Sequence, residues 1–305
     1  MTVTASLVKD LRAKTGAGMM DCKKALIEVN GDFESAIDWL RTKGLAAAAK
    51  KAGRVASEGL TAVHIDGNKS AVVEINSETD FVAKNETFQQ MVQEVAEIAT
   101  SCNNLEELKG KKVKSGKSVD EEIVANVATI GENLNLRRMQ SLSITGGVIV
   151  PYVHNAIKDN MGRISVLVAL ESKADKEKLS ELGKQIAMHI AATRPECLNK
   201  ESVDPSLVQR EKDIFTEQSR ASGKPDNIIE KMIEGRIRKF LEEIVLLDQT
   251  FVIDGKSKIS EVVANFAKEA GTDITLKAYA RLEIGEGIEK EESNFADEVA
   301  AAAKS

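Results

Sequence analysis

The chain has 305 residues, 42% of them hydrophobic and 30% charged, and 48 acidic residues against 42 basic ones give a net charge of −6 at pH 7. This composition excludes intrinsic disorder and collagen-like repeats, and it argues against a surface built throughout for polyanions. The length corresponds to about two domains. The longest apolar runs fall short of the about 20 residues that a membrane span needs, and an export signal is missing. We therefore expect a folded cytoplasmic protein without a membrane partner.

The cysteines and histidines are few and scattered. Their spacing gives neither a C-x-x-C pair nor an H-x-x-x-H pair, the patterns typical of metal and redox sites. We therefore expect reduced cysteines, no metal site and no cofactor. The residues concerned are Cys22, Cys102, Cys197, His64, His154 and His189.

Three short helices separated by glycines are expected over residues 1–43. Asp32 is placed to cap the third helix, and Gly44 is placed to end it. Residues 41–54 hold five basic residues and no acid, which suits a helical connector. Such a run is either a solvated linker or a patch that binds a polyanion, and the linker is the more common case.

The hydrophobic period then changes from helical to extended. Residues 60–65 and 71–75 alternate around an Asp66-Gly67 turn, which predicts a β-hairpin. Asn85 is the expected N-cap of an amphipathic helix that follows.

A second helix is expected to start at a capping box. Ser118 and Glu121 form the S-x-x-E pattern of such a box, and Gly131 is placed to end the helix after Ile130. Alternating segments return after this helix. These strands are expected over 134–144, from Val148 and from Ile164.

Two segments of the core resemble each other. Residues 71–99 and 165–191 each read as an apolar strand, a short polar loop and an amphipathic helix. The copies differ most in the connecting loop, which is long at 79–85 and short at 172–175. We therefore expect a duplicated core of antiparallel sheet and helix.

A long helical region follows Pro195. Helices are expected over 205–222 and 226–247, with Gly223 and Pro225 in the turn between them, which predicts an antiparallel helical hairpin. The hairpin has a structural role unless a partner is found for it. A helix over 259–270, a strand over 274–284 and a C-terminal helix from Glu292 complete an α+β fold.

No motif for covalent chemistry stands out. Gly116-Lys117-Ser118 ends like a phosphate-binding loop, but the glycine needed at position 111 is replaced by Lys111, and no buried strand precedes the loop. There is no G-x-S-x-G elbow and no recognisable catalytic triad. An enzyme is therefore disfavoured.

The loop Thr79-Asp80-Phe81-Val82 is the remaining candidate site. Aromatic residues are 4% of the chain, so a phenylalanine beside an acid in a strand-to-helix loop is notable. Phe81 either packs over the core or projects toward a partner. Packing is the more common case for a loop aromatic, whereas its absence from the second copy of the loop favours a functional role.

Several motifs, in order along almost the whole chain, resemble the bacterial elongation factor Ts family. Their number makes the match far more specific than any single short motif. They are LRAKTGAGMMDCKKAL, INSETDFVAKNETF, ATIGENLNLRR, IAMHIAATRPECL, SGKPDNIIEKMIEGRIRKF and GEGIEKEESNFADEVA.

The resemblance implies a guanine nucleotide exchange factor that binds elongation factor Tu and promotes release of its GDP. It implies that Thr79, Asp80, Phe81 and Val82 reach the magnesium-binding region of that partner. It also implies binding to the GDP-bound and nucleotide-free partner, in a heterodimer or higher heteromer, without covalent chemistry and without direct contact to nucleic acid.

The resemblance also implies the parts of the fold and further contact residues. An N-terminal three-helix module like a ubiquitin-associated (UBA) domain and a second core subdomain would bind the partner through Leu11, Arg12, Thr15, Gly16, Met19, Met20 and His154. The stretch 154–163 departs from the shorter glycine-rich turn of the family, so on its residues alone His154 is equally a solvated loop histidine. The expected parts are 1–55 (UBA-like module and connector), 56–140 (first core subdomain), 141–195 with 248–285 (second core subdomain), 196–247 (coiled-coil hairpin) and 286–305 (C-terminal helical module).

Two other classes of function remain open from the residues. The basic runs at 41–54 and 109–117 are compatible with an RNA-binding module, although no basic-aromatic platform accompanies them. A structural partner protein without exchange activity is the other alternative.

Overall fold

The computed structural model describes residues 3–15, 17–220 and 225–289, and it is mixed α and β with an antiparallel sheet. The predicted C-terminal helix from Glu292 and the predicted turn residue Gly223 lie outside the described residues. No helix of the described part is long and apolar enough to cross a membrane.

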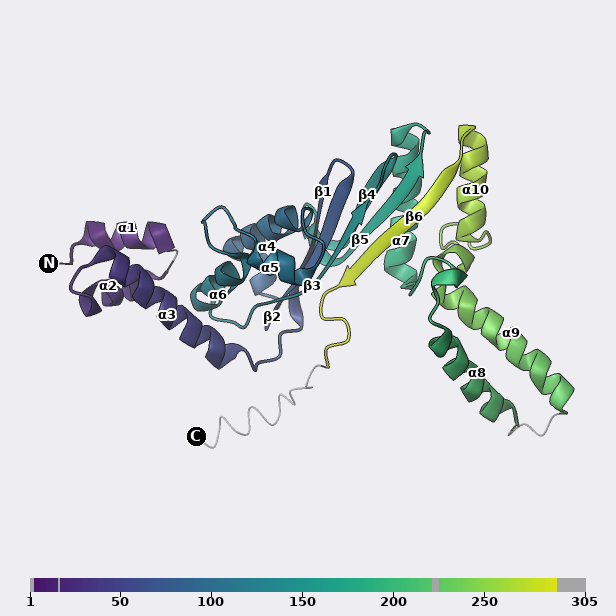
Figure 1. Cartoon of the computed structure of the whole chain (residues 1–305), viewed down its shortest axis with the longest axis horizontal. Helices are drawn as coiled ribbons and strands as arrows, with labels where there is room; N and C mark the ends of the chain where they lie inside the picture. Colours follow the sequence, from purple (N-terminus) through teal and green to yellow (C-terminus); the bar gives the residue numbers. More distant parts are fainter. Residues whose placement is uncertain (1–2, 16, 221–224, 290–305) are drawn as a thin grey trace.

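The N-terminal helices are α1 (Ala5–Thr15), α2 (Met19–Glu28) and α3 (Phe33–Lys51), and they form a bundle at one end of the molecule (Figure 1). Asp32 caps α3 as predicted, since its carboxylate accepts the backbone N–H of Ser35. The bundle has its own small core. The buried apolar residues are Val8, Leu11, Cys22, Ala25, Leu26 and Ala36.

The predicted end of the third helix at Gly44 is wrong, because α3 continues through it to Lys51. Gly44 is buried, and a Cβ placed on it would lie 3.6 Å from the Cβ of Ala128 in α6 (Val119–Ile130). Helix α3 is thus held by tertiary packing against α6, and that packing outweighs the weak helix propensity of one glycine.

Within the described residues, six strands form the sheet. Their order is β3-β2-β1-β5-β4, and β6 also pairs with β5. All pairs are antiparallel, and the predicted hairpin at Asp66-Gly67 is present between β1 and β2. The strands are β1 (Glu58–Asp66), β2 (Lys69–Ser77), β3 (Asn135–Ser143), β4 (Val148–Lys158), β5 (Met161–Ser172) and β6 (Ile274–Glu283).

The strand pairing between the two halves of the sheet is short. Thr61 and Ala62 of β1 pair with Gly162 and Met161 of β5, and the hydroxyls of Thr61 and Ser165 lie 2.8 Å apart. The interpretation of His154 as a loop residue is wrong, because β4 continues to Lys158 and turns directly into β5. The extended pairing with β5 holds this segment in the strand conformation.

Helices cover each half of the sheet on the outside. Helix α4 (Glu86–Ala99) packs on β1 and β2, whereas α7 (Lys176–Thr193) packs on β4 and β5. The faces turned away from these helices pack together, with β2 and β3 against β6. The shorter helices are α5 (Leu105–Gly110) and α6 beside α4, and α10 (Ile259–Ala270) beside β6.

The two strand–loop–helix copies bury matching positions of their helices. Each helix begins at a side-chain cap, Asn85 for α4 and Asp175 for α7. The matching buried positions are, in order, Phe88, Met91, Val92, Val95, Ala96 and Ala99 in α4 and Leu179, Leu182, Gly183, Ile186, Ala187 and Ile190 in α7, which also buries His189 and Ala191. The duplication predicted from the sequence is therefore also present in the packing.

A helical hairpin projects from the second half of the molecule (Figure 1). It consists of α8 (Pro205–Arg220) and α9 (Asp226–Ile244), which pack on each other. Helix α9 ends before the predicted Leu247, because Val245 is extended and bridges to Cys197. Short 3₁₀ turns complete the described structure at η1 (Val82–Lys84), η2 (Lys200–Ser202) and η3 (Leu246–Asp248).

Candidate interaction site

The loop between β2 and α4 presents a bare aromatic ring. Phe81 is 77% exposed, more than any other large hydrophobic side chain of the described residues. The interpretation that Phe81 packs over the core is therefore wrong. The residues that follow it, Val82 and Ala83, fill that place, with 5% and 3% exposure. They belong to the apolar core that α4 forms with β1 and β2, which we call the first core. The turn of 3₁₀ helix that starts after Phe81 sends its ring outward and these two side chains inward.

The N-terminal side of this loop is held by one carboxylate. Glu132 accepts the backbone N–H of Thr79 at 2.9 Å and its hydroxyl at 2.6 Å. The hydroxyl of Ser77 donates to the carbonyl of Thr79 at 2.9 Å. Because hydrogen bonds to a charged acceptor are the stronger kind, the backbone at Thr79 is firmly placed.

The C-terminal side of the loop is closed by backbone bonds. The N–H groups of Lys84 and Asn85 donate to the carbonyls of Phe81 and Val82 at 3.1 and 2.9 Å. Asn85 then caps α4 by accepting the N–H of Phe88 at 3.1 Å, as predicted. The exposed residues thus lie between two fixed ends.

Asp80 lies beside Phe81 at the outer edge of the loop and is exposed. Within the described part of the chain no hydrogen bond or ion pair engages its carboxylate. A carboxylate without a protein partner is available to act on groups outside this chain, such as another protein's cation or its ligands.

A second exposed patch lies on the N-terminal bundle. Met19 and Met20 are 54% and 73% exposed at the start of α2, and Arg12 of α1 is exposed. Methionine side chains are flexible and polarizable and suit adaptable contacts. The predicted contact residue Leu11 is fully buried in the core of the bundle. Thr15 is half-buried, and its hydroxyl donates to the carbonyl of Leu11 at 2.7 Å.

The remaining predicted contact residues are Gly16 and His154, and the structure does not place them beside the 79–82 loop. Gly16 lies outside the described residues. His154 is exposed on β4, where the hydroxyl of Tyr152 lies 3.1 Å from its Nδ1. Strands β5 and β1 separate β4 from β2, which leads into the loop. The structure thus brings Thr79, Asp80, Phe81 and Val82 together, but the bundle and His154 form separate patches.

Both basic runs are largely neutralised within the chain. At 109–117 every lysine is paired with a carboxylate, and at 41–54 several basic groups have partners. These pairs leave little free positive charge for a phosphate backbone, so the RNA-binding alternative gains no support. In the second run the contacts are Arg41 with Glu121, Lys43 with Asp21, Lys51 with the carbonyl of Gly131, and Arg54 with Glu78.

The described residues offer neither a metal centre nor an activated thiol. No group of three His, Cys, Asp or Glu side chains lies close enough among them to hold a metal ion. Burial raises the pKa of the Cys22, Cys102 and Cys197 thiols, which keeps them protonated and unreactive.

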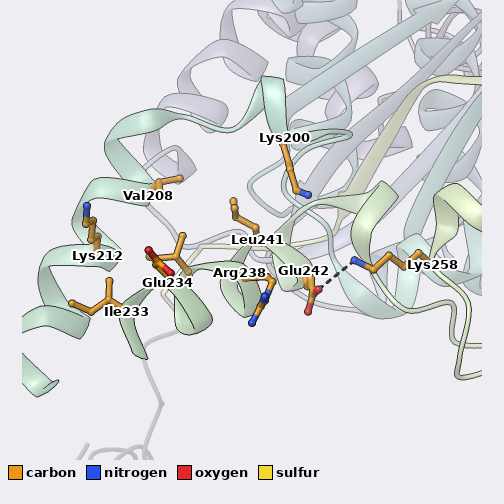
Figure 2. A pocket seen from close by; sticks show the side chains of 10 residues that line it. Lys200, Val208, Lys212, Ile233, Glu234, Arg238, Leu241, Glu242 and Lys258 are labelled. Atoms are coloured by element: carbon orange, nitrogen blue, oxygen red, sulfur yellow. Dashed lines mark hydrogen bonds and ion pairs between the residues drawn. The ribbon is translucent and has the colours of Figure 1, made fainter. Parts of the chain in front are cut away.

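A groove of about 490 Å³ at the root of the helical hairpin was not found from the sequence (Figure 2). Apolar side chains from both hairpin helices line it, among them Val208, Ile233 and Leu241, which the spacing of apolar residues assigned only to helix packing. Lysines surround it, and Lys258 pairs with Glu242 at 3.2 Å across its edge. The sequence also did not single out Glu132, although it lies in the motif ATIGENLNLRR.

Comparisons with known proteins agree with one another. The family model described as elongation factor TS matches residues 78–286. A protein of Rickettsia felis described as elongation factor Ts is 59% identical over 302 residues, which cover 99% of this chain and 98% of that protein. A protein of Rickettsia bellii with the same description is 58% identical over 305 residues, covering 100% and 99% of the two chains.

Proposed function

The chain belongs to the elongation factor Ts family, and on that premise we propose that its 79–82 loop is the element that expels GDP from the partner. The chain is a guanine nucleotide exchange factor for elongation factor Tu in translation elongation. Exchange is a coupling between two binding events, so it requires no nucleophile and no general base on this chain.

The chemistry of the partner indicates where the loop acts. In a P-loop GTPase, Mg²⁺ and the backbone of the phosphate-binding loop hold the nucleotide phosphates. Phe81 wedges between helices of the partner, and the carboxylate of Asp80 disturbs the surroundings of the partner's Mg²⁺. Both effects weaken the hold on GDP without any bond being made or broken.

The observation that carries this proposal is the exposure of Phe81 on a loop with fixed ends. Leaving an aromatic ring 77% in water forgoes the stabilisation that its burial would supply. Because the loop is ordered in advance, little conformational entropy is lost when the ring enters a partner. Such a residue is suited to binding another protein.

We propose further contacts that anchor the chain on its partner. Arg12, Met19 and Met20 of the UBA-like bundle grip the GTP-binding domain of the partner, with Thr15 and the buried Leu11 maintaining the shape of the bundle. The C-terminal module at 286–305 assists on the same domain, and Gly16 belongs to the same contact. His154 of the second core subdomain meets a different domain. The hairpin at 196–247 forms a short coiled coil.

The nucleotide dependence of binding follows from linkage. A factor that weakens the binding of GDP is itself bound more weakly by the GDP form than by the nucleotide-free form. This chain therefore forms a heterodimer or higher heteromer that is tightest without nucleotide, and a rebinding nucleotide releases it.

Stopped-flow release of a fluorescent GDP from elongation factor Tu tests the proposal. The wild-type chain accelerates release, and Phe81→Ala and Asp80→Ala each reduce the maximal rate by about tenfold or more, because each removes a contact made during exchange. Ile228→Ala is the matched control, since it trims a side chain 46% exposed on α9, away from the loop. Wild-type rates in both loop variants would contradict the proposal.

A further inference from the structure

We propose that Glu132 is a positioning residue for nucleotide exchange, which acts by holding the 79–82 loop in the conformation that presents Phe81. This inference rests on the proposed function of that loop. Both carboxylate oxygens of Glu132 are used on one residue, the N–H and the hydroxyl of Thr79, at 2.9 and 2.6 Å.

Glu132 is itself held on both sides along the chain. Gly131 before it ends α6 with a φ of 90°, a conformation that favours glycine. Asn133 after it donates its backbone N–H to Glu78 at 2.6 Å, and Leu134 is buried in the first core at 5% exposure. The carboxylate is therefore presented to Thr79 from a rigid base.

The same contacts tie the loop to the N-terminal connector. Glu78 forms an ion pair with Arg54 at 3.4 Å, and the amide of Asn133 donates to the carbonyl of Arg54 at 2.8 Å. The backbone preceding Thr79 is thus fixed to residues that are distant in sequence but adjacent in the fold.

This geometry divides the roles within the loop. The amide and hydroxyl of Thr79 are occupied within the chain, so Thr79 serves as the anchor, and Asp80 and Phe81 are the first residues free to project. Without Glu132 these donors seek water or another acceptor, and the loop samples more conformations. The partner then has to order the loop during exchange, which slows the step in which Phe81 enters.

The second copy of the core supports a specific role for this clamp. Its short loop is closed by the hydroxyl of Ser172, which donates to the carbonyl of Asp273 at 2.7 Å and accepts the N–H of Ala174 at 3.0 Å. A single hydroxyl is thus sufficient to close a strand-to-helix loop of this core. The carboxylate at Glu132 holds the longer loop, which alone carries an exposed aromatic ring.

GDP-release kinetics with the full chain test the inference. Two quantities are measured: the maximal rate of GDP release, and the concentration of this chain that gives half of the maximal rate. Glu132→Ala lowers the maximal rate about tenfold, whereas the half-saturating concentration changes by less than about threefold, because the other contact patches are intact. Thr79→Val, which removes only the hydroxyl, lowers the rate in the same direction, and Thr79→Ser restores it. Glu122→Ala is the control, since Glu122 accepts from Ser115 in the same subdomain without touching the loop.

The decisive arm places Glu132→Ala in a background that carries both Asp80→Ala and Phe81→Ala. If Glu132 acts through the loop, it adds less than about twofold to the combined effect of those two changes. If the rate reductions of Glu132→Ala and of the loop variants multiply in the combined variant, the inference is overturned and the proposed function still stands. The same holds if Glu132→Ala and Thr79→Val both exchange at the wild-type rate. Wild-type exchange by Phe81→Ala itself would overturn both. Thr79→Val keeps the test decisive if Glu132→Ala fails to fold.

Discussion

The two strand–loop–helix copies of the core have the same scaffold and different loops. Both run from a sheet strand into a helix with a side-chain N-cap, and both helices bury matching positions. The first copy inserts a turn of 3₁₀ helix and leaves Phe81 exposed, whereas the second passes directly from Ser172 to the cap at Asp175. We infer that stability resides mainly in what the copies share, and on the proposed function binding resides where their loops differ. Four predictions test this division, from the largest effect to the smallest.

The packing of α7 on β4 leaves no room for a side chain at Gly183. Gly183 occupies the position of Val92 in α4, and a Cβ placed on it would lie 2.5 Å from Cγ2 of Val150 in β4. Gly183→Ala is therefore expected to lower the free energy of unfolding by about 2 kcal/mol, measured by urea denaturation. Gly235→Ala in α9 is the control, because its Cβ meets open space, and it should stabilise by about 0.5 kcal/mol. Equal effects of the two changes would contradict the packing argument.

Substitutions at the neighbouring loop residues Val82 and Phe81 should differ in their effect on stability, although both lie in the loop proposed to act in exchange. Val82→Ala lowers the free energy of unfolding by about 1.5 kcal/mol, because Val82 is 5% exposed in the first core. Phe81→Ala changes it by less than about 0.5 kcal/mol, because its ring already faces water. Urea denaturation compares the two variants, and a large loss of stability in Phe81→Ala would mean that the ring packs within the chain.

Loss of either N-cap should lower the free energy of unfolding by the same amount, but only loss of the first should slow nucleotide exchange. Asn85→Ala and Asp175→Ala each remove a side-chain cap, at an expected cost of about 1 kcal/mol in thermal or urea unfolding. Asn85→Ala should also slow GDP release, since the side chain of Asn85 fixes the first turn of α4 directly after the turn that carries Phe81. Asp175→Ala should exchange at the wild-type rate, and slow exchange in both variants would argue against the division between the copies.

A pH effect on stability is expected at His189 of the second copy. His189 of α7 is buried, and its Nδ1 accepts the N–H of Val252 at 3.3 Å while Nε2 lies 2.8 Å from Oε1 of Gln249. Burial lowers the pKa of His189 below its ordinary value near 6.5. Above pH 7 both states are neutral; as pH falls below about 6.5 the unfolded chain takes up the proton first, so stability falls. Urea midpoints at pH 7.5 and 5.5 should therefore differ more in the wild type than in His189→Gln.

Local signals in the sequence predicted the elements well. The capping box at Ser118 and Glu121 and the cap at Asn85 are present, because such motifs act within one turn of helix. The predicted helix end at Gly44 failed, since packing of α3 on α6 is a contact between distant segments. The interpretation of His154 as a loop residue failed for the same reason, as strand pairing with β5 continues there.

The sequence by itself determined the family and the duplication of the core, and it singled out the 79–82 loop as the candidate site, because these depend on motifs and periodicities within short stretches. Only the tertiary structure decided that Phe81 faces solvent, that Leu11 is core and that Glu132 holds Thr79. Each of these depends on which segments meet in space. Burial and hydrogen bonding between segments far apart in the chain follow from the packing of the whole fold. They produce no hydrophobic period that can be recognised in a single sequence.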